Sequence, residues 1–443
     1  MITRTEPREC WEEDIETASR DDLGTVQLDR LTSQLERLYE RSPFYNARLR
    51  EAGFEPGALE TLDDVASLPT VTKAELRDEQ KLHPPFGRFV VADEGSLREV
   101  HPSSGTTGSP VNTIWSAADV DAIANMTART MWQFGVRPGD IVQNAFAYGL
   151  WVAGMSSHYA CSKLGVLVIP TGTGVPTAKQ IDYLRRAHST VLLSTPSYAI
   201  HIAEELKSSG IGPGETALRL GCFGGEAGTE NAATRQTIES GLGIDAFDYY
   251  GLAEIGPTFA SECSAKAGLH FAEDHILVEC VDPDSGKPVA DGDLGVLVFT
   301  HLTREATPML RYWSNDYARL TRERCACGRT HVRALDGVIG RHDDLVIFKG
   351  AKFYPSQVEK VVRTFSELSP EFHIELKRTS GASLVRGCTV VAEWAGAEVS
   401  GFDGRLTHAL RDELGVTPSV RLEPAGTLER TSFKAIRIVD RPT

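Results

Sequence analysis

The stretch His101-Pro102-Ser103-Ser104-Gly105-Thr106-Thr107-Gly108-Ser109-Pro110 follows an extended-looking run over 96–100 and places hydroxyl side chains close to two glycines. Its glycines let the backbone turn sharply and come close to a ligand. Backbone N–H groups and hydroxyls in such a loop can surround the oxygens of a polyphosphate. The loop lacks the lysine of a Walker loop, so a cation for the phosphates must come from elsewhere. An ordinary Ser/Thr/Gly surface loop stays open as the alternative.

The composition bounds the class of protein. At 443 residues the chain is long enough for two or three domains, and 41% hydrophobic and 24% charged residues are ordinary for a globular protein. The net charge of -15 argues against a nucleic-acid partner. No signal-peptide core, membrane-spanning run or dense disulfide framework is visible in the sequence. We therefore expect a cytoplasmic enzyme with no membrane partner.

Helical and extended segments alternate along the first half of the chain. Leucines at helical spacing predict one or two helices over 26–50, and Thr72 is placed to cap a helix. Further helices are predicted over 117–133, 159–164, 179–187 and 197–209, with strands over 140–145, 165–170, 191–194 and 218–224. This alternation predicts a parallel sheet, with functional loops beyond the carboxyl ends of its strands.

The second half of the chain changes pattern. Short alternating segments over 276–300, separated by Asp/Gly turns, predict an antiparallel β subdomain. After the principal boundary, helices are predicted over 357–364 and 402–414, with strands over 373–378, 389–394, 420–422 and 435–439. The predicted fold class is α/β, with a large N-terminal domain over 1–341, whose sheets are mostly parallel, and a small α+β C-terminal domain over 342–443.

Two loops end predicted neighbouring strands and carry residues suited to chemistry. The first is Gly221-Cys222-Phe223-Gly224-Gly225-Glu226, and the second is Asp248-Tyr249-Tyr250-Gly251-Leu252-Ala253-Glu254. Aromatic rings beside glycines can stack on a flat base, and the Glu254 carboxylate can hold a hard cation such as Mg²⁺. Together with the Ser/Thr/Gly loop, they favour a nucleotide site.

Several short motifs follow one another along the chain: SSGTTGSP at 103–110, NAFAYGL at 144–150, HYACSKLG at 158–165, YYGLAEIGP at 249–257, WSND ahead of Tyr317, GRHDDLVIFKG at 340–350, YPSQVE at 354–359 and SFKA at 432–435. Together they resemble the adenylate-forming superfamily of acyl-CoA synthetases, luciferases and carrier-protein adenylation domains, and within it the phenylacetate-CoA ligase branch. The resemblance covers roughly residues 42–440, and it implies that the small C-terminal domain is mobile.

The resemblance implies a role for each matching residue. The β- and γ-phosphates of ATP would be held by Ser103, Ser104, Gly105, Thr106, Thr107 and Gly108. The adenine side of the nucleotide site would be lined by Gly224, Gly225, Glu226, Tyr249, Tyr250 and Gly251. Asp316 and Arg341 would hold the ribose hydroxyls. Glu254 would bind Mg²⁺, and Lys434 would reach from the C-terminal domain toward the carboxylate and the α-phosphate.

The implied chemistry explains these residue types. A carboxylate that attacks the α-phosphate is an anion approaching an anion, so the protein must align the groups and neutralise charge. Without the other motifs, Lys434 would be interpreted as a solvated surface lysine. Asp343 matches the hinge about which the family rotates its small domain between adenylation and thiol transfer, and its alternative is a turn aspartate.

Four residues form a candidate metal site. Cys325 and Cys327 lie just before Gly328, and Cys263 lies shortly before His270. Together they would give the closed Cys₃His set of a structural zinc site, which resembles sites in some members of the branch. His275 is a rival ligand, and free thiols are the alternative to a metal site.

The resemblance also locates the acid pocket, near Tyr148, Gly149, Leu150, Trp151, Ser156, Ser157 and His158. Aromatic residues and glycine suit a flat aryl acid. Ser156 and Ser157 replace the small Gly-Ala common in the branch, and they suggest a hydroxylated or amino-substituted benzoate. The Lys349-Gly350-Ala351-Lys352 stretch departs from the motif that the family usually has near its pantetheine tunnel. The resemblance therefore supports CoA as the acceptor less firmly than ATP as the donor.

Three functions remain open on the sequence. The first is an aryl acid:CoA ligase that uses ATP, Mg²⁺ and CoA. The second is an adenylating enzyme of a natural-product pathway with another partner, either a carrier protein as acceptor or nitrite as the activated acid for diazotising an aromatic amine. The third is an inactive nucleotide-binding or regulatory protein, which the intact motifs argue against. A homodimer is common among similar enzymes.

Overall fold

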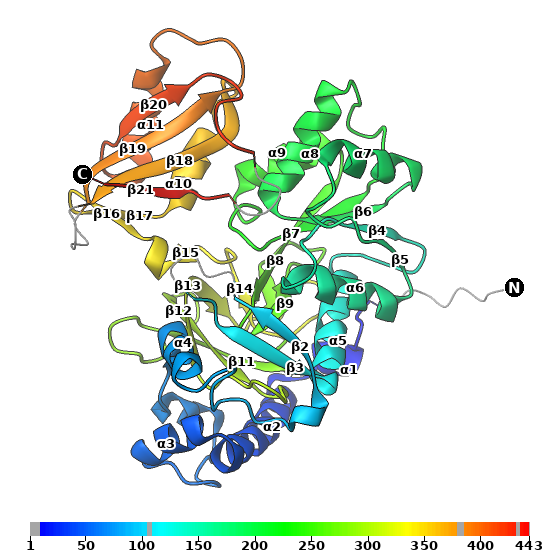
Figure 1. Ribbon diagram of the computed structural model, residues 1–443, viewed down its shortest axis with the longest axis vertical. Coiled ribbons are helices and arrows are strands. Elements are labelled where there is room, and N and C mark those ends of the chain that lie inside the picture. The colour runs from blue at the N-terminus through cyan, green and yellow to red at the C-terminus, as the bar shows by residue number, and fades with distance from the viewer. Residues whose placement is uncertain (1–8, 104–108, 379–384, 431–434, 443) are drawn as a thin grey trace, which may run out of the picture.

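The computed structural model describes residues 9–103, 109–378, 385–430 and 435–442. Within these ranges, no helix combines the length and apolar character needed to cross a membrane. Figure 1 shows a large body, built by most of the chain, with a smaller body formed by its C-terminal part above it.

A parallel sheet with helices on both faces forms one half of the large body, as the sequence predicts. Its neighbouring parallel strands are β5 (Leu167–Ile169), β4 (Ile141–Asn144), β6 (Val191–Ser194), β7 (Leu220–Phe223) and β8 (Asp245–Leu252). The helices are α5 (Ala117–Gln133), α6 (Val152–Leu164), α7 (Thr177–Arg186), α8 (Pro196–Ser208) and α9 (Ala232–Leu242). Because side chains alternate along a strand, Val191 packs toward α5 and α6, while Leu192 packs toward α7, α8 and α9.

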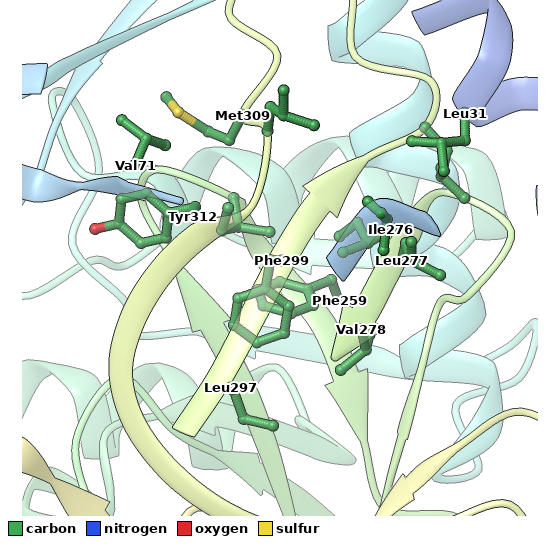
Figure 2. Packing of buried hydrophobic residues seen from close by; sticks show 14 of the residues in the cluster. Leu31, Val71, Phe259, Ile276, Leu277, Val278, Leu297, Phe299, Met309 and Tyr312 are labelled. Carbon is green, nitrogen blue, oxygen red and sulfur yellow. The ribbon is translucent and has the colours of Figure 1, made fainter. Parts of the chain in front are cut away.

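The same sheet continues as antiparallel strands, so the predicted antiparallel subdomain is joined to the parallel part through the β8–β9 pair. These strands are β9 (Gly256–Ser261), β10 (Leu269–Phe271), β11 (Ile276–Val281), β12 (Leu294–His301), β13 (Tyr312–Thr321), β14 (Arg333–Ala334) and β15 (Gly340–Arg341). Their core is aromatic: the Phe259 and Phe299 rings pack edge to face with centroids 5.2 Å apart (Figure 2).

The N-terminal helices cover this antiparallel part. They are α1 (Glu13–Glu16), α2 (Arg20–Arg41), α3 (Pro43–Glu51) and α4 (Lys73–Leu82). The region predicted as one or two helices is two, because Ser42 ends α2 and its side chain caps α3. The predicted cap at Thr72 is present, in a capping box with Glu75 at the start of α4. A strand of two residues, β1 (Val71–Thr72), pairs with β13 just before α4.

A ribbon of two strands, β2 (Leu97–Pro102) and β3 (Asn112–Ser116), flanks the Ser/Thr/Gly loop. The short 3₁₀ helices η1 (Leu62–Ser67) and η2 (Glu94–Ser96) lie in the connections that lead to it.

The smaller body has a sheet and a core of its own. Its strands are β16 (Val346–Phe348), β17 (Ala351–Phe353), β18 (Leu368–Arg378), β19 (Val385–Trp394), β20 (Ser419–Glu423) and β21 (Ile438–Pro442), and its helices are α10 (Pro355–Val362) and α11 (Phe402–Leu414). Ile374 and Val390 on the sheet pack with Phe402 and Leu406 of α11. Arg341 belongs to the sheet of the large body, where β15 pairs with β13 and sets Arg341 opposite Asp316. The 3₁₀ helix η3 (His342–Asp344), which contains Asp343, follows directly, at the predicted boundary.

Candidate active site and metal cluster

The base of the Ser/Thr/Gly loop is closed by Ser103. This residue is buried, its N–H donates to the Val111 carbonyl at 2.8 Å, and its hydroxyl accepts the Val111 N–H at 3.0 Å. Residues 104–108 of the predicted phosphate loop lie outside the described part of the chain. The described neck therefore holds the two ends of the loop together at the end of the β2–β3 ribbon.

The loop after β7 packs closely against β8. A Cβ on Gly224 would lie 2.5 Å from the Tyr249 carbonyl and 2.7 Å from its ring, so only glycine fits here. Gly225 has a φ of 85°, which also favours glycine. The Tyr249 ring is buried and contacts Phe146 edge to face, so it packs inside the sheet–helix core beneath the loop.

The two residues predicted for the ribose, Asp316 and Arg341, meet at one point together with Tyr250, which was predicted for the adenine side. Tyr250 donates its hydroxyl to Asp316 Oδ2 at 2.6 Å, and Arg341 Nη1 lies 2.9 Å from Asp316 Oδ1. Burial, and then the Asp316 carboxylate, raises the pKa of Tyr250 well above its usual range, so the phenol stays a donor. Three strands, β8, β13 and β15, thus hold one carboxylate with both oxygens engaged.

Glu254 lies in the turn between β8 and β9 and is buried. Lys73 Nζ lies 2.9 Å from its Oε1, yet that oxygen accepts no hydrogen bond of good geometry from the described residues. Burial and the nearby Glu254 raise the pKa of Tyr312 well above its usual range, so this phenol can donate to the carboxylate. An ion pair with Lys73 and the nearby Tyr312 phenol therefore accompany the buried Glu254 carboxylate.

Lys73 was not among the residues singled out from the sequence. The Thr72–Glu75 capping box shows that Lys73 opens a helix, but it gives no sign of what the lysine faces. Its position depends on β1 pairing with β13, which aligns Thr72 with Trp313 and brings the start of α4 to the Glu254 turn.

The predicted acid pocket lies between β4 and α6. Asn144 Nδ2 donates to the Tyr148 hydroxyl at 2.8 Å, and that hydroxyl lies 3.4 Å from His158 Nδ1. Gly149 has a φ of 81°, Leu150 is exposed, and Trp151 precedes the first turn of α6. Ser156 and Ser157 are both buried, and the Ser156 hydroxyl donates to the Ala153 carbonyl within the helix at 3.2 Å. The Ser156 hydroxyl is therefore satisfied without a ligand.

The four predicted metal ligands come together. The ligand atoms of Cys263, His270, Cys325 and Cys327 all lie within 4.8 Å of one another. Pairing of β9 with β10, and of β13 with β14, brings the two short sequence clusters to one place, and Gly328 turns the second cluster at a φ of 89°. Three thiols and one imidazole at this spacing fit a tetrahedral zinc ion. The rival His275 contacts Thr303 and Asp274 instead.

The two bodies touch through polar groups. Glu226 accepts the backbone N–H of Ser197 at 2.9 Å and that of Ala435 at 2.7 Å. Thr234 donates to Glu359 Oε1 of the C-terminal body at 3.2 Å. Lys434 lies outside the described residues, directly before Ala435 in the sequence. The sequence predicted Glu226 beside the adenine, and its contacts with both bodies were not foreseen.

The chain matches two protein-family models: "AMP-binding enzyme" over residues 46–313 and "AMP-binding enzyme C-terminal domain" over residues 350–442. It is 39% identical to phenylacetate-coenzyme A ligase of Thermus thermophilus, over 97% of this chain and 98% of that protein. It is 36% identical to phenylacetate-coenzyme A ligase of Escherichia coli, over 99% of this chain and 98% of that protein.

Solved structures of a 2-hydroxyisobutyryl-CoA ligase are similar over nearly the whole chain. The form with 2-HIB-AMP in the postadenylation state gives a TM-score of 0.93 at 31% identity, covering 99% of this chain and 93% of that one. The form with 2-HIB-AMP and CoA in the thioesterification state gives 0.75 at 31% identity, covering 99% and 94%. By its family matches and near-complete alignments, the chain belongs to the AMP-binding, adenylate-forming enzymes, in the phenylacetate-coenzyme A ligase branch.

Proposed function

We propose that the chain activates a small aromatic carboxylic acid with ATP and transfers the acyl group to CoA. The observation that carries the proposal is the meeting of Tyr250, Asp316 and Arg341 on strands next to the Glu254 turn. Asp316 would then meet the ribose, and Glu254 would hold the metal ion that accompanies the triphosphate. The relatives named phenylacetate-coenzyme A ligase support an aromatic acid as the first substrate and CoA as the acceptor.

The reaction runs in two steps. An oxygen of the acid attacks the α-phosphorus of ATP, the bond to the bridging oxygen of the β-phosphate breaks, and pyrophosphate leaves. The CoA sulfur then attacks the acyl carbon, and AMP leaves. Asp316 would accept the ribose hydroxyls, because Tyr250 and Arg341 fix the orientation of its carboxylate. Lys434 would neutralise charge as the acid approaches the phosphate.

Mg²⁺ fits the Glu254 carboxylate, because carboxylate oxygens are the ligands that this ion prefers, and Glu254 is buried with a cation, Lys73 Nζ, already 2.9 Å from its Oε1. The ion would offset the negative charge of the triphosphate. Lys73 occupies the neighbourhood of that oxygen and would exchange its partner from carboxylate to phosphate as nucleotide enters. It is a candidate for the cation that the Ser/Thr/Gly loop lacks on the N-terminal side.

We also propose a structural zinc ion in the Cys263, His270, Cys325 and Cys327 cluster. The donor set would fill all four positions of a tetrahedron, so the ion would pin two connections and leave no position for substrate. The buried His270 Nδ1 makes no hydrogen bond to the described residues, while Nε2 lies 3.6 Å from the Cys327 sulfur, as expected of a ring that faces the cluster through one nitrogen.

The acid pocket supports an aryl acid with a polar substituent. Since the Ser156 hydroxyl is bonded to its own helix, such a substituent would meet Ser157 or the Tyr148–His158 pair. A homodimer, a cytoplasmic location and a place in secondary metabolism stay predictions of the sequence. Light scattering of the purified protein would test the dimer.

The proposal is tested with a panel of benzoate, phenylacetate, hydroxybenzoates and aminobenzoates, with and without CoA. We expect pyrophosphate and AMP to form with one class of aryl acid, and the corresponding aryl-CoA to appear by mass spectrometry when CoA is present. Release of pyrophosphate without any thioester in the presence of CoA would contradict CoA as the acceptor. No release with any aryl acid would contradict the aromatic substrate.

A further inference from the structure

The Glu226 carboxylate is shared between the two bodies of the molecule. Oε1 accepts the N–H of Ser197 in the first turn of α8, and Oε2 accepts the N–H of Ala435, which precedes β21. The two donors, Ser197 and Ala435, are far apart in sequence, and both donate through the backbone. The bond to Ala435 therefore fixes the position of the main chain itself at the entry to the last strand.

A carboxylate suits this position for electrostatic reasons. The first N–H groups of a helix lack partners within the helix, and the helix dipole favours an anion there. Hydrogen bonds from backbone N–H groups to a charged carboxylate are shorter and stronger than those between neutral groups. Burial raises the pKa of Glu226, while the bonds from Ser197 and Ala435 and the charge of Arg437 oppose that rise. The Glu226 carboxylate is thus held at the start of α8 through Oε1, and its Oε2 faces the C-terminal body.

The bond to Ala435 belongs to one arrangement of the two bodies. Glu226 is anchored to α8, so a rotation of the C-terminal body would separate it from Ala435. The whole chain superposes on the 2-hydroxyisobutyryl-CoA ligase with a TM-score of 0.93 in its postadenylation state and 0.75 in its thioesterification state. The arrangement that contains the bond is therefore the one closer to the postadenylation form.

We propose that Glu226 is a positioning residue for the adenylation step. Through Ala435 it holds the chain that follows Lys434, and it releases that chain when the C-terminal body moves for thiol transfer. This inference rests on the two-step reaction proposed above. This role of Glu226 differs from lining the adenine pocket, because the carboxylate binds the backbone of the C-terminal body and not the nucleotide.

The test measures the two half-reactions separately in Glu226→Ala and in the isosteric Glu226→Gln. Adenylation is followed as acid-dependent exchange of pyrophosphate into ATP without CoA, and thiol transfer as aryl-CoA formation from a synthetic aryl adenylate. We expect Glu226→Ala to lower the maximal exchange rate about 10- to 100-fold, the loss expected for a hydrogen bond to a charged group. Glu226→Gln keeps an acceptor oxygen and should lie between Glu226→Ala and the wild type. Thiol transfer should fall less than adenylation, because the Glu226–Ala435 bond belongs to the arrangement closer to the postadenylation form.

Thr195→Ala is the matched control. Thr195 caps the same helix by accepting the Tyr198 N–H at 3.4 Å, and no described contact joins it to the C-terminal body. It should lower the melting temperature without separating the two half-reactions. Equal loss of both half-reactions in Glu226→Gln would overturn the inference. So would a raised KM for ATP with an unchanged maximal exchange rate, which indicates contact with the nucleotide. Absence of exchange in the wild type would overturn the proposed function and this inference with it.

Discussion

At the scale of the residue, the Lys73–Glu254 pair is the contact with the clearest chemical consequence. The Glu254 side chain is 3% exposed and that of Lys73 is 29% exposed, so the carboxylate depends on its partner more than the lysine does. A buried carboxylate without a counter-ion is unfavourable in the folded state. A divalent cation and Lys73 are therefore alternative ways to stabilise the same side chain.

Replacing Lys73 by methionine should make stability depend on Mg²⁺. Without Mg²⁺, we expect the free energy of unfolding to fall by about 1–3 kcal/mol, because Glu254 loses its counter-ion. Added Mg²⁺ should restore more of the melting temperature in Lys73→Met than in the wild type. Lys81→Met, an exposed position of the same helix, is the control and should show no Mg²⁺ effect. Equal Mg²⁺ responses in all three proteins would contradict this role for Lys73.

Single residues could be proposed from the sequence where a motif carries them, although their roles stay predictions. Glu254, Asp316 and Arg341 were identified from short stretches of sequence, and the structure brings Asp316 and Arg341 into contact. Lys73 could not be identified, because its role arises from strand pairing between Val71 and Tyr312 far along the chain. A local capping pattern shows where a helix begins but not what its first residue faces.

At the scale of the element, the metal cluster connects two parts of the antiparallel sheet. Cys263 follows β9 and His270 lies in β10, whereas Cys325 and Cys327 lie between β13 and β14. These segments approach one another only through the sheet. A zinc ion would therefore act as a cross-link between connections that are distant in sequence.

Zinc removal should loosen these connections without changing the nucleotide site. We expect about one zinc per chain by elemental analysis of the purified protein, the stoichiometry of one closed Cys₃His site. Cys327→Ser should lose most of the zinc and melt at a lower temperature. Cys388→Ala removes a buried cysteine of the C-terminal core, outside the cluster, and should retain zinc. Wild-type protein that contains no zinc would refute the site.

A second prediction for an element concerns acid. The pKa of Glu375 is lowered to about 2, chiefly by side-chain hydrogen bonds from Arg421 of β20. Burial raises this pKa, and hydrogen bonds from Arg441 of β21 lower it further. A carboxyl whose pKa is lower in the folded than in the unfolded state stabilises the fold above its unfolded pKa of 4.5, and this contribution is lost as pH falls toward about 2.

Glu375→Gln should thus destabilise the protein at pH 6 and have a shrinking effect as pH falls from 4.5 to about 2. We expect about 1 kcal/mol at pH 6, because both arginines are partly exposed to solvent. Urea unfolding of the two proteins at pH 6, 4 and 2.5 measures the difference. A difference that stays constant, or grows, toward low pH would disagree with the assignment.

Elements were predictable where their ends carry local signals. The helices predicted over 117–133 and 402–414 have these bounds, since Ser116 caps the first and Gly415, with a φ of 67°, ends the second. Helix α6 begins at Val152, not at the predicted 159. The sequence did not reveal this start, because Trp151 at the N-cap position provides no capping side chain. Strand β21 begins at Ile438, not at the predicted 435, and the Ala435 N–H bonds to Glu226 instead.

At the scale of the whole molecule, the two bodies meet through hydrogen bonds and through the Tyr354 ring, which packs beside Tyr317 with centroids 6.1 Å apart. Besides Glu226 with Ala435, the Ser356 hydroxyl donates to the Ile339 carbonyl at 3.2 Å, beside the boundary between the two bodies. Hydrogen bonds of this kind can be broken and replaced as the bodies rotate. The sequence predicted a small separate domain, but it could not show which residues meet across the boundary.

The proposed mechanism requires the chain to form an acyl adenylate with the help of Lys434. The most direct measurement is acid-dependent exchange of labelled pyrophosphate into ATP, without CoA, for the wild type and Lys434→Ala. We predict exchange with an aryl acid in the wild type, and a loss of about 10²–10³ in rate in Lys434→Ala with ATP binding retained. Exchange that is absent with every aryl acid would rule out aryl adenylate formation, and equal exchange in the two proteins would rule out the role of Lys434.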